Sequence, residues 1–146
     1  MQYIIEIITI LVLVFLSIID LKTYNLSEGC IPSALTTMFI LFTFLGKDDA
    51  TVNIIYLIIL SALIGVLLLD LNTFHGLADL KIFIALGLTT NNIIGIIILT
   101  LILLIISIIY KTIVKLIRER KGNLNNEIAY IPIMLVSYII HLIIIL

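Results

Sequence analysis

Two aspartates have the residue type and the placement that hydrolytic chemistry would need. Asp20 closes the first apolar run of the chain, and Asp79 opens the fourth, within FHGLADLK at residues 74–81. Two neighbouring carboxylates can hydrolyse an amide. One, ionised, takes a proton from water, while the other, kept protonated by its neighbour's charge, donates to the carbonyl oxygen and then to the leaving nitrogen. Such a pair titrates as a unit, so the roles of acid and base stay open.

The composition indicates an integral membrane protein. Of 146 residues, 63% are hydrophobic and 12% are charged, and the mean hydropathy is +1.38. A soluble domain could not bury so much apolar surface. The single cysteine, Cys30, excludes a disulfide framework and a zinc site of paired cysteines, and we expect neither a metal nor a cofactor. The chain has no basic arm or aromatic-rich polar face, so a nucleic-acid partner is not expected.

Six apolar runs predict an all-α polytopic membrane protein, with six transmembrane helices in a single membrane-embedded domain over residues 1–146. Most runs have about 17 to 20 residues, enough at about 1.5 Å per residue to cross a hydrocarbon core of about 30 Å. Strands are disfavoured because the runs show no alternation of polar and apolar residues. The first run lacks the features of a cleaved signal peptide, and the fourth is short. The runs cover residues 3–20, 29–45, 52–70, 75–88, 92–110 and 128–146.

The basic residues predict the orientation of these helices in the cell membrane. Six crossings place seven of the eight Lys and Arg residues on one side and Lys47 alone on the other. By the positive-inside rule the basic side is the cytoplasm, so both termini are expected outside. If the fourth run only dipped into the membrane, the basic segment at residues 111–121 would lie opposite Lys22 and Lys81. We therefore expect a short fourth crossing, which places both aspartates at the cytoplasmic boundary.

The candidate carboxylates also have simpler explanations. Ionisable groups at membrane helices are functional candidates, but Asp20 could reach the headgroup region. Asp79 could instead cap the helix after its glycine-containing turn. A third carboxylate on the same face, Asp70, has no glycine or turn to expose it to a substrate, and we expect it to be interfacial. The small residues Gly76 and Ala78 would let an extended peptide approach Asp79 closely, as a substrate must.

The histidines and the last basic segment have less specific roles in this prediction. His75 is expected to hydrogen-bond a helix end or to tune the aspartate pair, and His141 is expected at the outer interface. Cys30 is expected to be a packing residue, because no histidine lies beside it. The segment from Lys111 to Lys121 is expected to be a loop that orients the chain and contacts anionic lipid.

Three stretches in order carry a family resemblance. They are DLKTYNLSEGCI, which begins at Asp20, GLADLK, with Gly76, Ala78 and Asp79, and AYIPIML around Pro132. Together with a six-helix layout they resemble the type IV prepilin peptidases and archaeal preflagellin peptidases, which are GxGD intramembrane aspartic proteases. The stretches match, respectively, an aspartate followed by a basic stretch, the GxGD motif and a proline-containing last helix.

Two departures from the family pattern leave both candidate carboxylates in place. Ala78 stands at the second glycine of the motif, and residues 26–28, Leu-Ser-Glu, stand where Ile-Pro-Asn is expected. The missing proline affects the conformation of the loop after Asp20. That conformation in turn affects how far the Asp20 side chain can reach.

The resemblance implies that Asp20 and Asp79 are catalytic and that the partner is a pilin-like or archaellin-like precursor. Its short basic leader would be cut on the cytoplasmic side, just before its hydrophobic helix. Glu28, Asp70 and Glu127 would attract that leader. The chain lacks the cysteine-bearing cytoplasmic domain of bacterial members, so we expect an aspartic endopeptidase without methyltransferase activity.

Two other classes of function use the same acids differently. A small proton-coupled carrier would bind ions with them, although carriers usually place such groups near the bilayer midplane and often contain inverted repeats, and the sequence shows neither. A structural membrane subunit would use the acids only to pair with Lys22 and Lys81.

Overall fold

The computed structural model confirms the all-α prediction for the part of the chain that it describes. The described residues are 2–23, 29, 31, 33–34, 50–71, 73–74, 76–90, 92–121 and 128–145, and none of them forms a strand. The helices are α1 (Gln2–Thr23), α3 (Ala50–Asp70), α4 (Leu77–Thr89), α5 (Ile93–Lys121) and α6 (Ile131–Ile145). Most of the predicted second segment, residues 29–45, lies outside the described residues, as do Glu28, Cys30, Lys47, His75 and Glu127.

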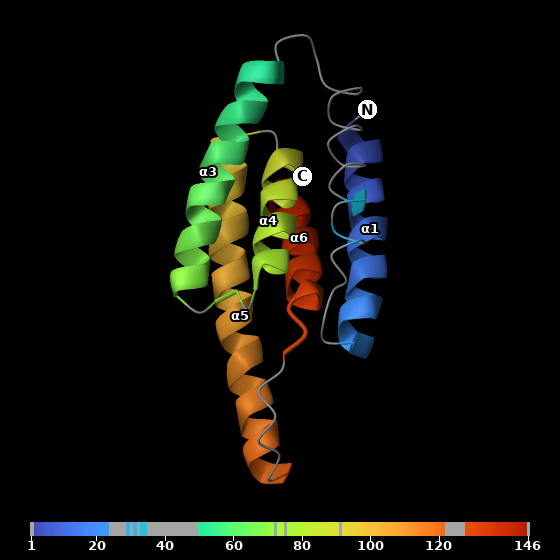
Figure 1. Ribbon diagram of the computed structural model, residues 1–146, viewed down its shortest axis with the longest axis vertical. Coiled ribbons are helices and arrows are strands. Elements are labelled where there is room, and N and C mark those ends of the chain that lie inside the picture. Colours follow the sequence, from blue (N-terminus) through green and yellow to red (C-terminus); the bar gives the residue numbers. More distant parts are fainter. Residues whose placement is uncertain are drawn as a thin grey trace.

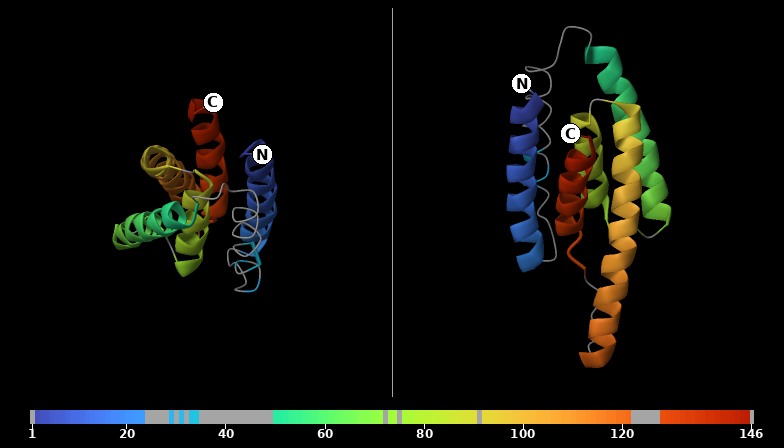
Figure 2. Two further views of the ribbon diagram at one scale, coloured as in Figure 1. Left: turned by 90° about the horizontal axis from the view of Figure 1, so that it is seen from above. Right: turned by 180° about the vertical axis from the view of Figure 1, so that it is seen from behind.

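The helices form a bundle in which two short helices lie at the centre. Figure 1 shows α4 and α6 between α1 on one side and the pair α3 and α5 on the other. The view from behind in Figure 2 shows the same order, and α4 packs chiefly on α3 while α6 packs on both α5 and α1. The end of α1 and the beginnings of α4 and α6 lie at the same end of the bundle (Figure 1). Any side chains at these three helix ends are therefore brought together.

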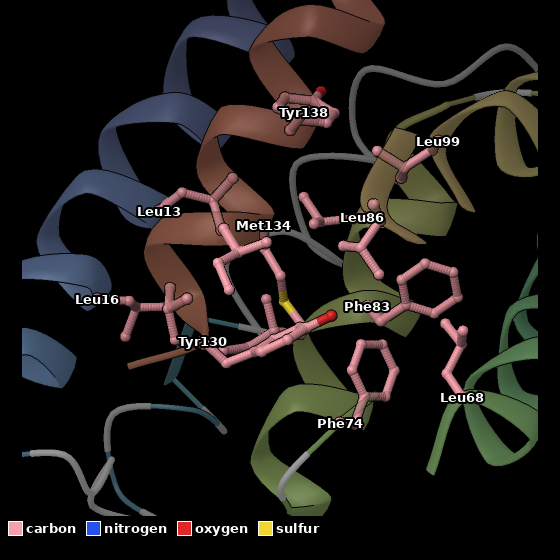
Figure 3. Close-up of a cluster of buried hydrophobic side chains, with 14 of the residues drawn as sticks. Leu13, Leu16, Leu68, Phe74, Phe83, Leu86, Leu99, Tyr130, Met134 and Tyr138 are labelled. Atoms are coloured by element: carbon pink, nitrogen blue, oxygen red, sulfur yellow. The ribbon is translucent and has the colours of Figure 1, made fainter. Parts of the chain in front are cut away.

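The core is apolar and joins the five helices listed above. Figure 3 shows Leu13 and Leu16 of α1 beside Met134 of α6, with Phe83 of α4 and Leu68 of α3 on the other side. Because α4 contributes to this core along most of its length, it is held in place although it is the shortest of the described helices.

The outer faces of the longer helices are also apolar. Ile7 of α1, Leu63 of α3 and Ile105 of α5 are each more than half exposed, as expected for side chains that face lipid. Among the described residues, two helices are long and apolar enough to cross a membrane, at Tyr3–Thr23 and Ile93–Ile117, and α3 and α6 contain shorter apolar stretches. The six crossings stay a prediction.

One predicted boundary is wrong. The fifth apolar run was expected to end at residue 110 and to pass into a basic loop, but α5 continues to Lys121, 29 residues in all. Figure 1 shows its last turns projecting beyond the other helices. Lys and Arg have high helix propensity and their aliphatic stems cover apolar surface, so a basic stretch can extend an apolar helix.

Candidate active site

Asp20 lies in the last turn of α1 and faces the bundle interior. Leu13, Leu16, Ser17 and Asp20 follow the helical repeat of one face, and all four are buried. The Asp20 carboxylate is only 6% exposed. Its Oδ2 accepts a hydrogen bond of 3.0 Å from the backbone N–H of Ile131. This carboxylate therefore does not reach the headgroup region as a free surface charge, because a donor from the start of α6 holds it.

The beginning of α6 is built to offer that donor. The first helical N–H groups have no partner within their own helix, and Pro132 has no N–H and suits the first turn. The carbonyl of Tyr130 already accepts from Ile133 at 3.0 Å and from Met134 at 3.2 Å. The Ile131 N–H is left for Asp20, which thus acts across the bundle as the N-terminal acceptor of α6.

Asp79 lies in the first turn of α4, on the face that packs into the core. It is 7% exposed, and Ile82, Phe83 and Leu86, three, four and seven positions further on, are also buried. The cap prediction for this residue is wrong. The N-cap is Gly76, which makes no side-chain cap hydrogen bond, and Asp79 is the third residue of the helix. Its burial is thus a consequence of the same helical face that forms the core.

A lysine of α5 lies close to the second carboxylate. The Nζ of Lys111 donates a hydrogen bond of 3.2 Å to the carbonyl oxygen of Thr73, in the turn between α3 and α4. The same ammonium group interacts electrostatically with Asp79. A nearby opposite charge favours the ionised form of a carboxyl group and offsets the cost of burying it.

Tyr130 comes directly before α6 and is also part of this end of the bundle. Its side chain is 2% exposed, and its ring meets that of Phe74 edge-on, with centroids 5.5 Å apart. The phenol also interacts electrostatically with the carboxylate of Asp79. A tyrosine hydroxyl carries a proton that it can donate in a hydrogen bond.

The two carboxylates are thus connected through consecutive residues. Ile131 donates to Asp20, while its neighbour Tyr130 interacts with Asp79. Both carboxylates also lie near helix N-termini, those of α6 and α4, where the helix dipole and free N–H groups favour negative charge by about 0.3–2 kcal/mol each. These donors and dipoles stabilise an ionised carboxylate, which is the form that a general base needs.

The residues expected to admit a substrate lie beside this pair. Gly76 is half-buried, and an added Cβ there would meet no described heavy atom within 4 Å. Its φ of −169° is extended backbone that any residue can adopt. Gly76 therefore matters for the open space beside it and not for its backbone conformation. Ala78 is also half-buried and packs against the core, and Asp70 is exposed at the end of α3.

Sequence reasoning missed two residues that interact with Asp79, namely Lys111 and Tyr130. Lys111 was assigned to an orienting loop, and in the sequence only its position next to the apolar run distinguishes it from the basic residues that follow. A buried tyrosine gives no signal in an apolar sequence. His141, which was expected at the outer interface, is buried in the bundle at 2% exposure, and its ring stacks on that of Tyr138, with centroids 6.2 Å apart.

The described residues contain no group of three or more His, Cys, Asp or Glu side chains that could hold a metal ion. No family model, curated protein or solved structure matches this chain.

Proposed function

We propose that this chain is an intramembrane aspartic endopeptidase that removes the short basic leader peptide from pilin-like or archaellin-like precursors. The observation that carries the proposal is the burial of Asp20 and Asp79 at one end of the bundle, against the consecutive residues Tyr130 and Ile131. Acids that only reach the surface do not need such partners, as exposed Asp70 illustrates.

The proposed reaction uses the two carboxylates as one unit. A water molecule held between them loses a proton to the ionised carboxylate and attacks the scissile carbonyl carbon. The protonated carboxyl group donates to the carbonyl oxygen, and the leaving nitrogen is protonated as the bond breaks. No covalent intermediate with the protein is needed. Cleavage yields the leader with a new carboxylate and the mature chain with a new amino group, which the proposed enzyme leaves unmethylated.

The proposed setting is the cell membrane, crossed six times, with the aspartate end facing the cytoplasm and both termini outside. The apolar outer faces and the two long apolar helices support a membrane location. The position of both carboxylates at helix ends favours a peptidase over a carrier, which usually binds its ion near the midplane of the membrane. A precursor whose cleavage site directly precedes a hydrophobic helix would present its scissile bond at this depth.

Cleavage of a precursor in cells tests the proposal. A pilin-like or archaellin-like precursor with a C-terminal tag is co-expressed with the parent chain or with the Asp20→Asn, Asp79→Asn and Asp70→Asn variants. All four proteins are first shown to insert equally. The parent and Asp70→Asn should produce the mature chain, identified by mass spectrometry of its N-terminus, and the other two should leave the precursor intact, with a loss of at least about a thousandfold.

Two results would contradict the proposal. Cutting by both the Asp20→Asn and the Asp79→Asn variants would remove these residues from the reaction. Failure of the parent to cut any of several precursors would favour the carrier or the structural subunit instead.

A further inference from the structure

Lys111 joins two parts of the chain that are far apart in sequence. It lies on α5, it is partly buried, and its Nζ donates to the Thr73 carbonyl at 3.2 Å, across 38 positions. Thr73 is itself 8% exposed. A lysine that only marked the cytoplasmic side of the membrane would not need to be buried against a turn, and Lys115, one turn later on α5, is exposed.

The turn that Lys111 contacts leads directly into the helix of Asp79. The backbone N–H groups of Thr73 and Phe74 both donate to the Leu68 carbonyl, at 2.9 and 3.2 Å, so the turn folds back onto the end of α3. The Thr73 carbonyl then faces α5 and accepts from Lys111. The ammonium group of Lys111 thereby fixes the start of the segment that leads from Thr73 to Asp79.

The charge of Lys111 also matches that of the carboxylate pair. Two carboxyl groups that share one proton carry one negative charge, and a buried charge of this kind costs several kcal/mol unless it is compensated. The Lys111 ammonium group interacts with Asp79 and brings one positive charge. Among the described residues, Tyr130 before α6 also interacts with Asp79. The other described ionisable residues at the ends of helices here are Asp20 and exposed Lys22 on α1, half-buried Lys81 on α4 and exposed Asp70 on α3.

We propose that Lys111 is a positioning residue of the active site, whose ammonium group fixes the turn before α4 and balances the charge of the aspartate pair. This inference rests on the proposed function. Lys111 acts through Asp79 and the Thr73 carbonyl, and takes no part in bond making or breaking.

Replacing Lys111 should affect the rate and its pH dependence together. In Lys111→Met, kcat near neutral pH should fall about ten- to a hundredfold, the usual effect of losing a hydrogen bond to a charged group, with KM within about twofold of the parent's value. Because a nearby positive charge lowers the pKa of a carboxyl group, its loss raises that pKa. The limb of the pH–rate profile that reports ionisation of the aspartate pair should therefore move to higher pH. Lys111→Arg, which keeps the charge, should recover most of kcat and the parent's profile.

Lys115→Met is the matched control, because it removes the same charge from the same helix, one turn further on. It should leave kcat and the pH profile unchanged, which separates an effect at the site from one on membrane orientation. All variants are purified in detergent, reconstituted, and assayed with one synthetic precursor peptide.

Each possible result decides the inference. An active parent with an unchanged Lys111→Met variant overturns the role of Lys111 and leaves the peptidase standing. Equal losses of kcat in Lys111→Met and Lys115→Met would show a role in membrane orientation. Equal losses of kcat in Lys111→Met and Lys111→Arg, without a shifted pH–rate profile, would show a purely structural role. Either result also overturns the proposed role of Lys111. An inactive parent overturns both the inference and the proposed function.

Discussion

The two ends of the helical bundle both bury polar side chains, but they satisfy them in different ways. At the threonine end, formed by Thr9, Thr89 and Thr90, each hydroxyl donates at 2.8 Å to a backbone carbonyl three or four residues earlier in its own helix. At the aspartate end, formed by Asp20 and Asp79, the interactions join different helices. Ile131 donates to Asp20 across 111 positions.

The difference shows which buried polar groups suggest function. A threonine that bonds to its own helix costs little and needs no particular tertiary structure. A buried carboxylate is expensive unless the fold brings donors or opposite charge to it, so its retention indicates a use for that charge. Burial of polar groups alone would have selected both ends, while buried carboxylates held by distant partners select the aspartate end.

Removing one hydroxyl group at each end provides the sharpest test of this contrast. Tyr130→Phe keeps the ring that packs on Phe74 and removes the neutral phenol beside Asp79. We expect kcat for precursor cleavage to fall about tenfold, the usual effect of losing one hydrogen bond of about 1.4 kcal/mol. Tyr138→Phe removes an equally buried hydroxyl from α6 toward the threonine end and should leave kcat unchanged. Equal effects of the two changes would show that the hydroxyl groups matter only for packing.

Two glycines allow a test that separates substrate access from packing. Space is open beside Gly76, whereas a Cβ added at Gly87 would lie 2.7 Å from the Ser61 Cβ, where α4 packs on α3. Gly76→Val should raise KM severalfold by filling the approach to Asp79, with unfolding unchanged. Gly87→Val should lower the stability of the protein by about 1–3 kcal/mol, as overpacking does. Thermal unfolding in detergent and the cleavage kinetics of both variants measure these effects. A loss of stability in Gly76→Val but not in Gly87→Val would contradict the assignment of Gly76 to substrate access and of Gly87 to packing.

The smallest effect is expected at the threonine end itself. Thr9→Val removes a hydroxyl that donates to the Ile5 carbonyl of its own helix. Stability should change by less than about 1 kcal/mol, and the cleavage rate should not change. A fall in kcat with this variant would show that the threonine end contributes to the reaction, and would remove the contrast between the ends.

Much of the helical layout was predictable from the sequence, because polar residues interrupt the apolar runs. The predicted run at 52–70 corresponds to α3 at Ala50–Asp70, and the short run at 75–88 to α4 at Leu77–Thr89. The end of α5 was not predictable in this way, since basic residues can either form a loop or continue a helix. The number of membrane crossings depends on the surrounding lipid as well as on the chain.

The aspartates themselves were predictable, but their partners were not. Asp20 and Asp79 stand at the ends of apolar runs, where a charged residue is conspicuous. The donor to Asp20 is a backbone N–H of Ile131, which no side-chain type can indicate. Lys111 is one of several basic residues in a row, and only the packing of α5 against the turn at Thr73 distinguishes it from Lys115.

Binding of a transition-state analogue tests most directly whether Asp20 and Asp79 form one catalytic pair. The analogue is a precursor peptide whose scissile amide is replaced by a hydroxyethylene group, so that its hydroxyl stands where the attacked carbonyl would be. The reconstituted parent should bind it at least about a hundredfold more tightly than the same peptide with a plain ethylene group. The Asp20→Asn and Asp79→Asn variants should each lose that preference. Equal affinity of the parent for both peptides, or an undiminished preference in either variant, would contradict the account.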